Sequence, residues 1–367
     1  MPGSLYVGLM SGTSLDGVDG VLAELSASAP RVLAHVHQPF AADLRAELLA
    51  LNTTGADELS RAALAGNALA RAYAAVVSSV LVRGGIAAED VAAVGVHGQT
   101  VRHRPGGFDG TGYTIQLNNP ALLAELCGID VIADFRSRDV AAGGQGAPLA
   151  PGFHRAWFGR AGKITAVLNI GGISNLSVLS DATTLGFDCG PGNALMDDWC
   201  QRHLGTPYDD GGRWAASGRM IDALLHALLA EPYLSLPPPK STGRDLFNPQ
   251  WLAPFLPAGA APADVQATLA EFTSRCIAAD VRRHAEGAER LVVCGGGAYN
   301  AFLLQRLGAL LPGLPIGISD DHGLPASEVE ATAFAWLAQR FVERRAGNLP
   351  SVTGARGERV LGALYPK

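Results

Sequence analysis

A β-strand, a turn of small residues and a second strand are predicted twice in this chain. The first occurrence begins with the apolar run 5–7, passes through the glycine- and hydroxyl-rich stretch 8–17 and resumes at 18–25. The second extends over residues 163–179 and has a Gly-Gly turn. Short apolar runs interrupted by such residues are typical of strands joined by tight turns. The recurrence favours a chain whose two halves begin in the same way.

The first turn has the residue types of an anion-binding loop. Its glycines permit positive φ angles and close approach of the backbone, so successive N–H groups can point at phosphate oxygens. Ser11, Thr13 and Ser14 add hydroxyl groups. The stretch lacks the Gly-Lys-Ser/Thr of a P-loop, and it differs from a Rossmann fingerprint because no helix follows. On this turn alone, an ordinary glycine-rich hairpin is equally well supported.

Two such hairpins facing each other across a cleft would clamp a polyphosphate, as in the nucleotide-binding fold of actin, hexokinase and Hsp70. A third glycine-rich stretch, at 291–300, combines a buried strand, glycines and a helix start, and in that fold it would lie against the adenosine. We therefore predict an α/β protein with two ribonuclease-H-like domains around a nucleotide cleft.

The length of 367 residues favours two domains, since one core rarely supports so long a chain. We place the N-terminal domain at 1–135, with 347–367 returning to it, and the C-terminal domain at 136–346. The charged and then glycine-rich run 134–148 is the predicted crossing between them. The proline-rich residues 233–249 are predicted to form an excursion on the surface, serving as a lid or a dimer contact.

Charge and composition exclude several classes of partner. The net charge is −6, and no basic patch suggests nucleic acid. No apolar span of about eighteen residues predicts a membrane segment, and no signal peptide is recognisable. The five cysteines form no C-x-x-C pair, which favours buried thiols in a reducing compartment over a disulfide or zinc framework. We expect a cytoplasmic protein.

Asp188 is the candidate general base. It follows a predicted strand and precedes a Gly-Pro-Gly turn, where a carboxylate can project toward a water or a hydroxyl. Phosphoryl transfer needs little more from the protein than positioning and electrostatic stabilisation. The alternative is an Asx cap on the helix that begins near Asn193, and the spacing alone favours that cap.

Candidate substrate contacts follow other predicted elements. His97 comes after a buried strand, although a histidine there is more often a structural residue. Arg136 and its neighbour Arg138 can bind a carboxylate through bidentate hydrogen bonds, or can pair with nearby aspartates. Glu330 lies in the first turn of a predicted helix, where it can equally complement the helix dipole.

Seven motifs, in order and across essentially the whole chain, resemble those of the anhydro-N-acetylmuramic acid kinase family. They are residues 8–17, 97–100, 133–136, 144–149, 169–175, 188–193 and 330–335. The resemblance implies an enzyme of bacterial cell-wall recycling that uses water to cleave the 1,6-anhydro ring of anhydro-N-acetylmuramate. It would phosphorylate the freed O6 from ATP, giving N-acetylmuramate 6-phosphate and ADP.

The resemblance also implies roles for individual residues. Asp188 would activate the attacking water, and His97, Gln99, Arg136 and Glu330 would contact the sugar. The ATP-binding set would be Ser11, Gly12, Thr13, Ser14, Leu15, Asp16, Gly17, Val18, Asn169, Gly171, Gly172, Gly295, Gly296, Gly297 and Asn300. Many members of the superfamily begin the first hairpin with an aspartate that organises Mg²⁺, but here that position is apolar or glycine. Mg²⁺ would therefore be held mainly by ATP phosphates and water, and no protein ligand is named. A homodimer is implied as well.

Two alternatives remain at this point. A related sugar or acyl kinase would keep the ATP clamp, and Asp188 would then deprotonate a hydroxyl that is already free. A nucleotide-dependent interaction protein would keep the clamp without a small-molecule site, but no separate peptide-binding domain follows.

Overall fold

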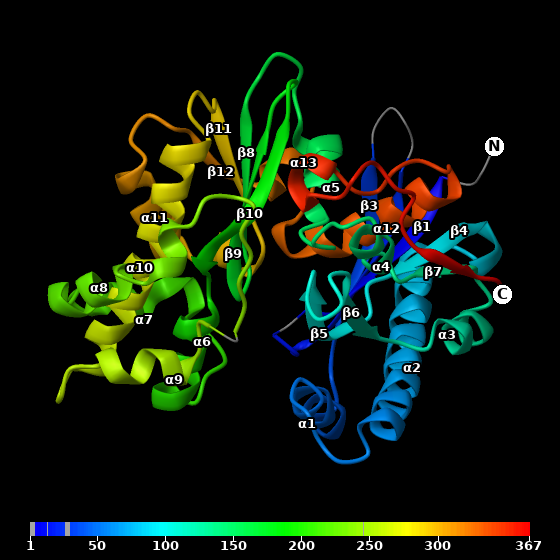
Figure 1. Ribbon diagram of the computed structural model, residues 1–367, viewed down its shortest axis with the longest axis horizontal. Coiled ribbons are helices and arrows are strands. Elements are labelled where there is room, and N and C mark those ends of the chain that lie inside the picture. Colours follow the sequence, from blue (N-terminus) through cyan, green and yellow to red (C-terminus); the bar gives the residue numbers. More distant parts are fainter. Residues whose placement is uncertain (1–3, 13, 26–29, 245) are drawn as a thin grey trace. The chain divides into compact units, whose positions relative to one another are not determined.

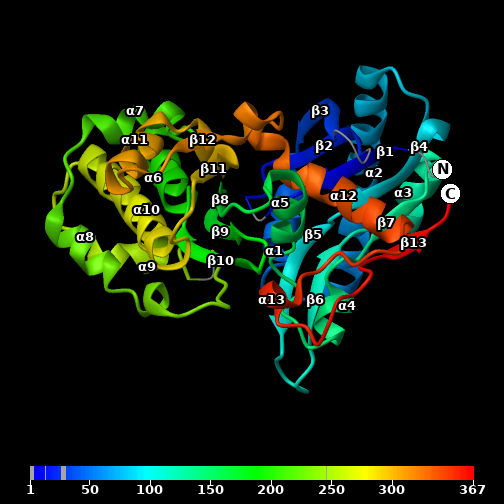
Figure 2. The same ribbon diagram turned by 90° about the horizontal axis from the view of Figure 1, so that it is seen from above.

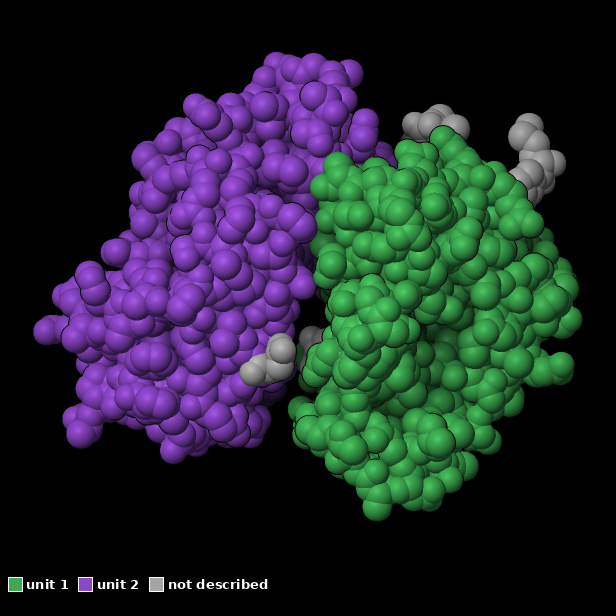
Figure 3. Space-filling model, in the orientation of Figure 1, with its two compact units in different colours: residues 1–153, 328–367 green, residues 154–327 purple. Residues whose placement is uncertain are grey.

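The computed structural model describes residues 4–12, 14–25, 30–244 and 246–367. The chain divides into two compact units (Figure 3). Unit 1 comprises residues 1–153 and 328–367, and unit 2 comprises residues 154–327.

The sheet of unit 1 has the strand order β13-β7-β4-β1-β2-β3 (Figure 1). Its strands are β1 (Leu5–Met10), β2 (Gly17–Glu24), β3 (Arg31–Pro39), β4 (Val91–Val96), β7 (Val131–Ala133) and β13 (Ala363–Tyr365). Strands β1, β2 and β3 form an antiparallel meander, whereas β4 is parallel to β1 and β7 is parallel to β4. Strands β5 (Gln99–Pro105) and β6 (Gly112–Leu117) form a separate hairpin, which projects from the unit in Figure 2.

Helices cover both faces of this sheet because neighbouring strand residues point to opposite faces. The helices are α1 (Ala42–Ala50), α2 (Glu58–Gly84), α3 (Pro120–Cys127), α4 (Ser137–Ala141), α12 (Val329–Val342) and α13 (Pro350–Thr353). Gly20 faces Val76 of α2, whereas Gly8 and Gly95 face the backbone of α12. A methyl group at Gly8 or Gly95 would overlap carbonyl groups of α12, so these two glycines let the helix lie directly on β1 and β4 (Figure 2).

Among the residues that the structure describes, α2 alone is long and apolar enough by composition to cross a membrane. Its residues Leu69, Tyr73 and Val76 are fully buried, and the helix packs on β2 and β3. This is the environment of a core helix.

Unit 2 repeats the plan, with the strand order β10-β9-β8-β11-β12. The strands are β8 (Thr165–Ile170), β9 (Ile173–Leu179), β10 (Thr184–Pro191), β11 (Arg290–Cys294) and β12 (Ile316–Ile318). Again the first three strands are antiparallel and the last two are parallel to the first. This 3-2-1-4-5 order with its change of direction is the ribonuclease-H-like arrangement, so the predicted fold class is confirmed.

The helices of unit 2 surround one long buried helix. They are α6 (Ala194–Leu204), α7 (Arg213–Ser217), α8 (Asp222–Leu229), α9 (Pro249–Leu252), α10 (Pro262–His284) and α11 (Ala301–Leu310). Helix α10 contacts β9 and β10 as well as α6, α7, α8 and α11. It is therefore buried around most of its circumference, its polar residues Glu271 and Asp280 included.

The remaining helical segments are short. Helix α5 (Ala150–Phe158) spans the division between the units. The 3₁₀ turns are η1 (Ala88–Asp90), η2 (Asp210–Gly212), η3 (Pro232–Ser235), η4 (Ala253–Phe255), η5 (Gly296–Tyr299), η6 (Ser319–His322) and η7 (Ala326–Glu328).

The units divide elsewhere than the expected boundaries after residues 135 and 346. Residues 136–153 and 328–346 belong to unit 1, because α12 packs on β1 and β4. The buried Asp139 carboxylate also joins the two segments, since it accepts hydrogen bonds from Gly146 N, Asn348 Nδ2 and Thr353 Oγ1.

Candidate active site

Ser11 ends β1 with its side chain turned into unit 1. Its hydroxyl donates to the Gly98 carbonyl oxygen at 3.2 Å and lies 2.7 Å from the Tyr73 hydroxyl. Since a serine hydroxyl has one proton, Tyr73 is the donor in the second bond. The Ser11 side chain is thus engaged in a buried network.

Hydrogen bonds within the β1–β2 turn fix the rest of its conformation. Ser14 Oγ donates to Asp16 Oδ1 at 2.7 Å, and Gly17 N donates to the same oxygen at 3.0 Å. Ser14 and Asp16 are exposed, whereas Leu15 is buried in the left-handed region, with a φ of 56°. A leucine with such a φ angle is unusual, and its burial in the core of unit 1 anchors the turn. Thr13 lies outside the described residues.

His97 and Gln99, which follow β4, bind this turn. Gln99 Nε2 donates to the Gly12 carbonyl oxygen at 3.0 Å. His97 Nδ1 lies 3.2 Å from the Ser11 carbonyl oxygen, which can only accept, so Nδ1 carries the proton. Burial, with the nearby Arg136 charge, lowers the pKa of His97 to about 3. The ring is therefore neutral, and its Nε2 is an acceptor.

Arg136 supplies the donors to that acceptor. Its Nε lies 3.1 Å and its Nη2 2.9 Å from His97 Nε2, while Nη1 donates to the Gly146 carbonyl oxygen at 2.8 Å. Sequence left open an ion pair with Asp134 or Asp139. Asp134 accepts hydrogen bonds from Ser137, and Asp139 serves the network that joins the two segments of unit 1.

Glu330 lies in the first turn of α12 and keeps access to solvent. Crowding by protein atoms desolvates its carboxyl and, together with Asp19 and Asp16, raises its pKa to about 7, although Arg136 opposes the shift. A carboxylate that mainly complemented a helix dipole would have a lowered pKa. The raised pKa comes first from desolvation and then from the neighbouring carboxylates, a combination found at many functional sites.

Asp19, on β2, is the centre of this acidic group. Its Oδ1 lies 3.0 Å from His35 Nε2 and 3.1 Å from His37 Nδ1. Within the described ranges, no three His, Cys, Asp or Glu side chains are placed to bind a metal ion.

In unit 2 the β8–β9 turn closes on the loop that leads to α6. The Gly171 carbonyl accepts from Asn193 N, and the Gly172 carbonyl accepts from Gly192 N and Ala194 N. Asn193 Nδ2 also donates to the Ile170 carbonyl oxygen at 3.2 Å. These bonds bring the glycine turn to the N-terminus of α6, a place that suits anions.

The glycines after β11 have a packing role. Gly295 has a φ of 78°, and a methyl group on it would lie 2.8 Å from the Ile170 carbonyl oxygen. Gly297 also packs on Ile170, whereas Gly296 is exposed. Asn300 caps α11, because its Oδ1 accepts from Leu303 N at 3.1 Å. Asn169, at the end of β8, is buried beside Gly295.

Asp188, on β10, is half-buried and sits beside an irregularity in the β9–β10 pairing, between Asp188 and Gly190. Such bulges re-aim side chains next to active sites. Asp188 Oδ2 accepts a hydrogen bond from Thr242 N at 3.0 Å. The cap position of α6 is occupied by Asn193, so the structure does not favour the alternative in which Asp188 caps that helix.

Sequence reasoning missed the residues that hold Asp188. The Lys240 carbonyl accepts from Asp188 N at 3.2 Å, and the Tyr233 hydroxyl donates to the Asp188 carbonyl at 2.8 Å. The segment 233–242 is part of the stretch 233–249 that we predicted to be a surface excursion, but Tyr233 and Lys240 are buried. A lysine just after three prolines is the one local signal, and it does not reveal a partner.

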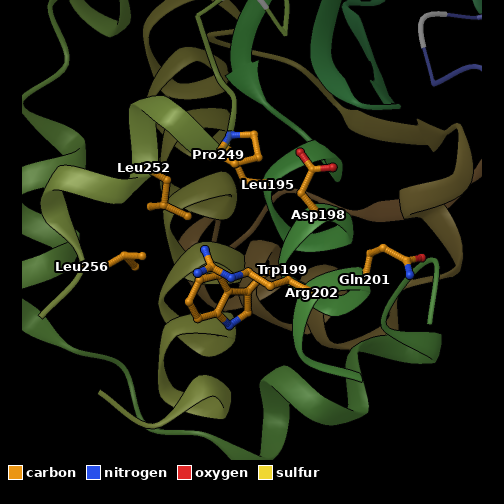
Figure 4. Close-up of a pocket in the computed structure, with 8 residues that line it drawn as sticks. All are labelled: Leu195, Asp198, Trp199, Gln201, Arg202, Pro249, Leu252 and Leu256. Carbon is orange, nitrogen blue, oxygen red and sulfur yellow. The ribbon is translucent and has the colours of Figure 1, made fainter. Parts of the chain in front are cut away.

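A hollow of about 240 Å³ lies elsewhere in unit 2 (Figure 4). It is lined by residues of α6 and of the 249–256 region, namely Leu195, Asp198, Trp199, Gln201, Arg202, Pro249, Leu252 and Leu256. None of the predicted site residues lines it.

Comparison with known proteins finds a family whose model matches almost the whole chain. Residues 4–367 match the family model described as anhydro-N-acetylmuramic acid kinase. The chain is 64% identical over 374 residues to the anhydro-N-acetylmuramic acid kinase of Variovorax paradoxus (strain S110), covering 100% of both chains. It is 58% identical over 371 residues to that of Cupriavidus metallidurans, covering 99% of this chain and 98% of the relative.

Solved structures are more distant. Component A of (R)-2-hydroxyglutaryl-CoA dehydratase from Acidaminococcus fermentans has a TM-score of 0.49 at 14% identity, covering 90% of this chain and 96% of that one. A ROK family glucokinase from Streptomyces griseus in complex with glucose and AMPPNP has a TM-score of 0.42 at 13% identity, covering 92% and 99%. The family match and the full-length relatives carry the assignment, and the chain belongs to the anhydro-N-acetylmuramic acid kinase family.

Proposed function

We propose that this kinase opens the 1,6-anhydro ring of anhydro-N-acetylmuramic acid with water and phosphorylates the freed O6 from ATP. The products are N-acetylmuramic acid 6-phosphate and ADP, and the reaction serves cell-wall recycling. The observation that carries the proposed mechanism is the fixed position of the Asp188 carboxylate. It is half-buried beside a strand bulge, and one of its oxygens accepts a hydrogen bond from a backbone N–H.

Asp188 acts as the general base. Its carboxylate takes a proton from water as the water oxygen bonds to the anomeric carbon and the bond from that carbon to O6 breaks. The electron pair left on O6 attacks the γ-phosphorus of ATP, and ADP leaves. Asp188 then returns its proton to solvent, so the net reactants are the anhydro sugar, water and ATP.

ATP is bound by the two glycine turns and the stretch after β11. The turn 11–18 binds the phosphates through backbone N–H groups other than those of Gly17 and Leu15, which are donated to Asp16 and Gly12 within the turn. Asn169, Gly171, Gly172, Gly295, Gly296, Gly297 and Asn300 complete the nucleotide contacts. Mg²⁺ supplies charge neutralisation on the phosphates. It would be held mainly by the ATP phosphates and water.

The sugar is bound by Arg136 and Glu330, and His97 and Gln99 support this site from behind. Arg136 suits the lactyl carboxylate of the substrate because a guanidinium forms bidentate bonds to carboxylates, and the neutral His97 orients it. His97 itself acts through Arg136, and Gln99 acts through the turn that it binds.

The kinase acts in the cytoplasm as a homodimer, without nucleic acid or membrane partners. The net charge of −6 supports the exclusion of nucleic acid. The cysteines are free thiols, and apart from the partly buried Cys127 they are buried, which suits a reducing compartment.

An assay of ADP release tests the proposal. Purified protein with MgATP is given anhydro-N-acetylmuramate or, in parallel, N-acetylmuramate, and the phosphosugar is identified by mass spectrometry. We expect the anhydro sugar to be consumed and Asp188→Asn to lower kcat by about a hundredfold or more. Asp264→Asn is the matched control, because Asp264 also accepts a backbone N–H, from Arg219 at 2.7 Å.

Each outcome separates one part of the proposal. No turnover of the anhydro sugar would remove the substrate assignment. Turnover of N-acetylmuramate alone would favour a kinase for a free hydroxyl. An undiminished rate in Asp188→Asn would remove the base assignment.

A further inference from the structure

A buried ion pair lies directly behind Asp188. Lys240 Nζ lies 3.1 Å from Asp280 Oδ2, and the two side chains are 2% and 1% exposed. Lys240 follows the proline run of the segment 233–242, whereas Asp280 lies on α10. The pair therefore fastens this irregular segment to the most deeply buried helix of unit 2.

Aromatic rings complete the environment of the ammonium group. Lys240 Nζ lies 5.6 Å from the centre of the Phe187 ring and 5.2 Å from that of Tyr233. Both distances are within cation–π range. Phe187 precedes Asp188 on β10, and the Tyr233 hydroxyl donates to the Asp188 carbonyl oxygen. The ammonium is thus in contact with residues on both sides of the Asp188 backbone.

The segment fastened by this pair contacts Asp188 through three groups. The Lys240 carbonyl accepts from Asp188 N, Tyr233 donates to the Asp188 carbonyl, and Thr242 N donates to the carboxylate. Only Ser241 separates the buried Lys240 from Thr242, whose amide binds the carboxylate. Any shift of Lys240 would consequently move the Thr242 amide relative to Asp188 Oδ2.

Stability alone is a poor explanation of such a pair. Desolvation of two charges commonly exceeds their attraction, and apolar replacements of both partners are often as stable as the pair. The pair also fixes the direction of the Lys240 side chain, because the buried ammonium group pairs with the Asp280 carboxylate. Asp280 Oδ1 lies 3.5 Å from Arg283 Nη1 and 4.0 Å from His284 Nε2 but accepts no hydrogen bond from the described residues, so the Asp280 carboxylate is held through its bond from Lys240.

We propose that Lys240 and Asp280 are positioning residues that hold Thr242 N against the Asp188 carboxylate and so orient the base for attack on the sugar. The proposal rests on the assignment of Asp188 as the base. Neither residue touches the substrate. Their effect on the reaction passes through the hydrogen bond to Asp188 Oδ2, which favours the ionised form of that carboxylate.

The test removes both charges together. Lys240→Met with Asp280→Asn keeps the side-chain volumes and leaves no unpaired buried charge. We expect kcat on anhydro-N-acetylmuramate to fall by roughly tenfold to a hundredfold, with KM for ATP unchanged. The acid limb of the kcat–pH profile should move up by about one pH unit, because a weakened Thr242 bond no longer favours the carboxylate.

Other titratable groups face this region and must be accounted for in that profile. They are Tyr233, Cys189, Cys276, Arg283 and His284. Burial is the main cause that raises the pKa of Tyr233 and of both thiols and that lowers the pKa of His284. The acid limb of the kcat–pH profile, measured in Tyr233→Phe, identifies any contribution of the Tyr233 phenol to that limb.

The matched control is the exposed pair between Lys163 and Glu289 in the same unit, with Nζ 2.5 Å from Oε1. Lys163→Met with Glu289→Gln should leave kcat and the acid limb as in the wild type. If the buried double variant does not fold, the acid limb of the kcat–pH profile is measured in Asp280→Glu instead. This variant keeps both charges but displaces the Lys240 ammonium group. The limb should then move in the same direction by less.

The outcomes distinguish this proposal from the one beneath it. A wild type without turnover refutes the proposed function, and an active Asp188→Asn refutes the base assignment on which the pair depends. A wild-type acid limb and kcat in the pair variants, together with an inactive Asp188→Asn, overturns the positioning role alone.

Discussion

The Arg136 guanidinium donates to Nε2 of His97, at 3.1 Å from Nε and 2.9 Å from Nη2. The histidine in turn donates from Nδ1 to the Ser11 carbonyl oxygen. One neutral ring therefore connects the first glycine turn to the arginine that we assign to the substrate carboxylate.

His97→Ala removes the acceptor that orients Arg136. We expect KM for the anhydro sugar to rise by about tenfold, equivalent to roughly 1.4 kcal/mol, with a smaller change in KM for ATP. Steady-state kinetics with each substrate varied in turn measures both. His322→Ala is the control, because His322 lies beside Arg290 at an exposed place. Equal rises for the two substrates would contradict the orienting role.

Buried neutral histidines make the fold sensitive to acid. Burial lowers the pKa of His154 to about 3, and its Nδ1 lies 2.9 Å from Ser177 Oγ. An unfolded chain takes up a proton near pH 6.5 that the folded one refuses, so stability falls as the pH drops from about 6.5 toward 3. At pH 4.5 this amounts to about 2–3 kcal/mol. Urea unfolding should show a smaller loss between pH 7.5 and 4.5 in His154→Gln than in the wild type. An equal loss would count against a buried neutral ring.

Glu330 gives the opposite dependence. Because its pKa is raised to about 7, the folded chain binds a proton that the unfolded chain has already released. Stability thus falls as the pH rises from the ordinary range of a glutamate to about 7. Urea midpoints of Glu330→Gln should exceed those of the wild type by more at pH 8 than at pH 4.5.

The same carboxyl should appear in catalysis. If the ionised form binds the sugar, kcat/KM falls below about pH 7. Asp19→Asn should move this limb to lower pH, because the charge of Asp19 contributes to the raised pKa. If the acid limb of kcat/KM does not move in Asp19→Asn, the limb does not report the ionisation of Glu330.

Close packing of α12 predicts a size limit at Gly95. Gly95→Ala places a methyl group against the Phe334 carbonyl and 3.0 Å from Ala338 Cβ, and we expect a loss of about 1–3 kcal/mol. Gly308→Ala is the matched control, since Gly308 lies within α11 with open space around it. That variant should gain roughly 0.5–1 kcal/mol. Thermal unfolding compares the two, and similar midpoints would show that α12 can move aside.

Local patterns sufficed for much of the fold. The predicted strands at 5–7 and 18–25 fall on β1 and β2 and differ from them only at the strand ends, because alternation and turn glycines are local signals. The glycine turns also made the repeated plan visible. In the site, Glu330 lies in a first helical turn, as predicted, and Asp188 lies on β10, close to the end of that strand.

Contacts between distant residues could not be predicted. The direction of the Ser11 hydroxyl depends on Tyr73, which is 62 positions away, and Lys240 meets Asp280 40 positions away. Nothing near Lys240 indicates which of many carboxylates it pairs with. The membership of α12 in unit 1 likewise depends on two glycines in β1 and β4, far from the helix in sequence.

The placement of α12 also bears on how the protein folds during synthesis. Strands β1 to β7 of unit 1 leave the ribosome first, but the helix that covers β1 and β4 is translated only after all of unit 2. Unit 2 is one continuous stretch and can complete its sheet while it emerges. For the time needed to translate about 170 residues, at about 5–20 residues per second, one apolar face of the first sheet is without its helix, and it is in this interval that a chaperone would find its binding surface.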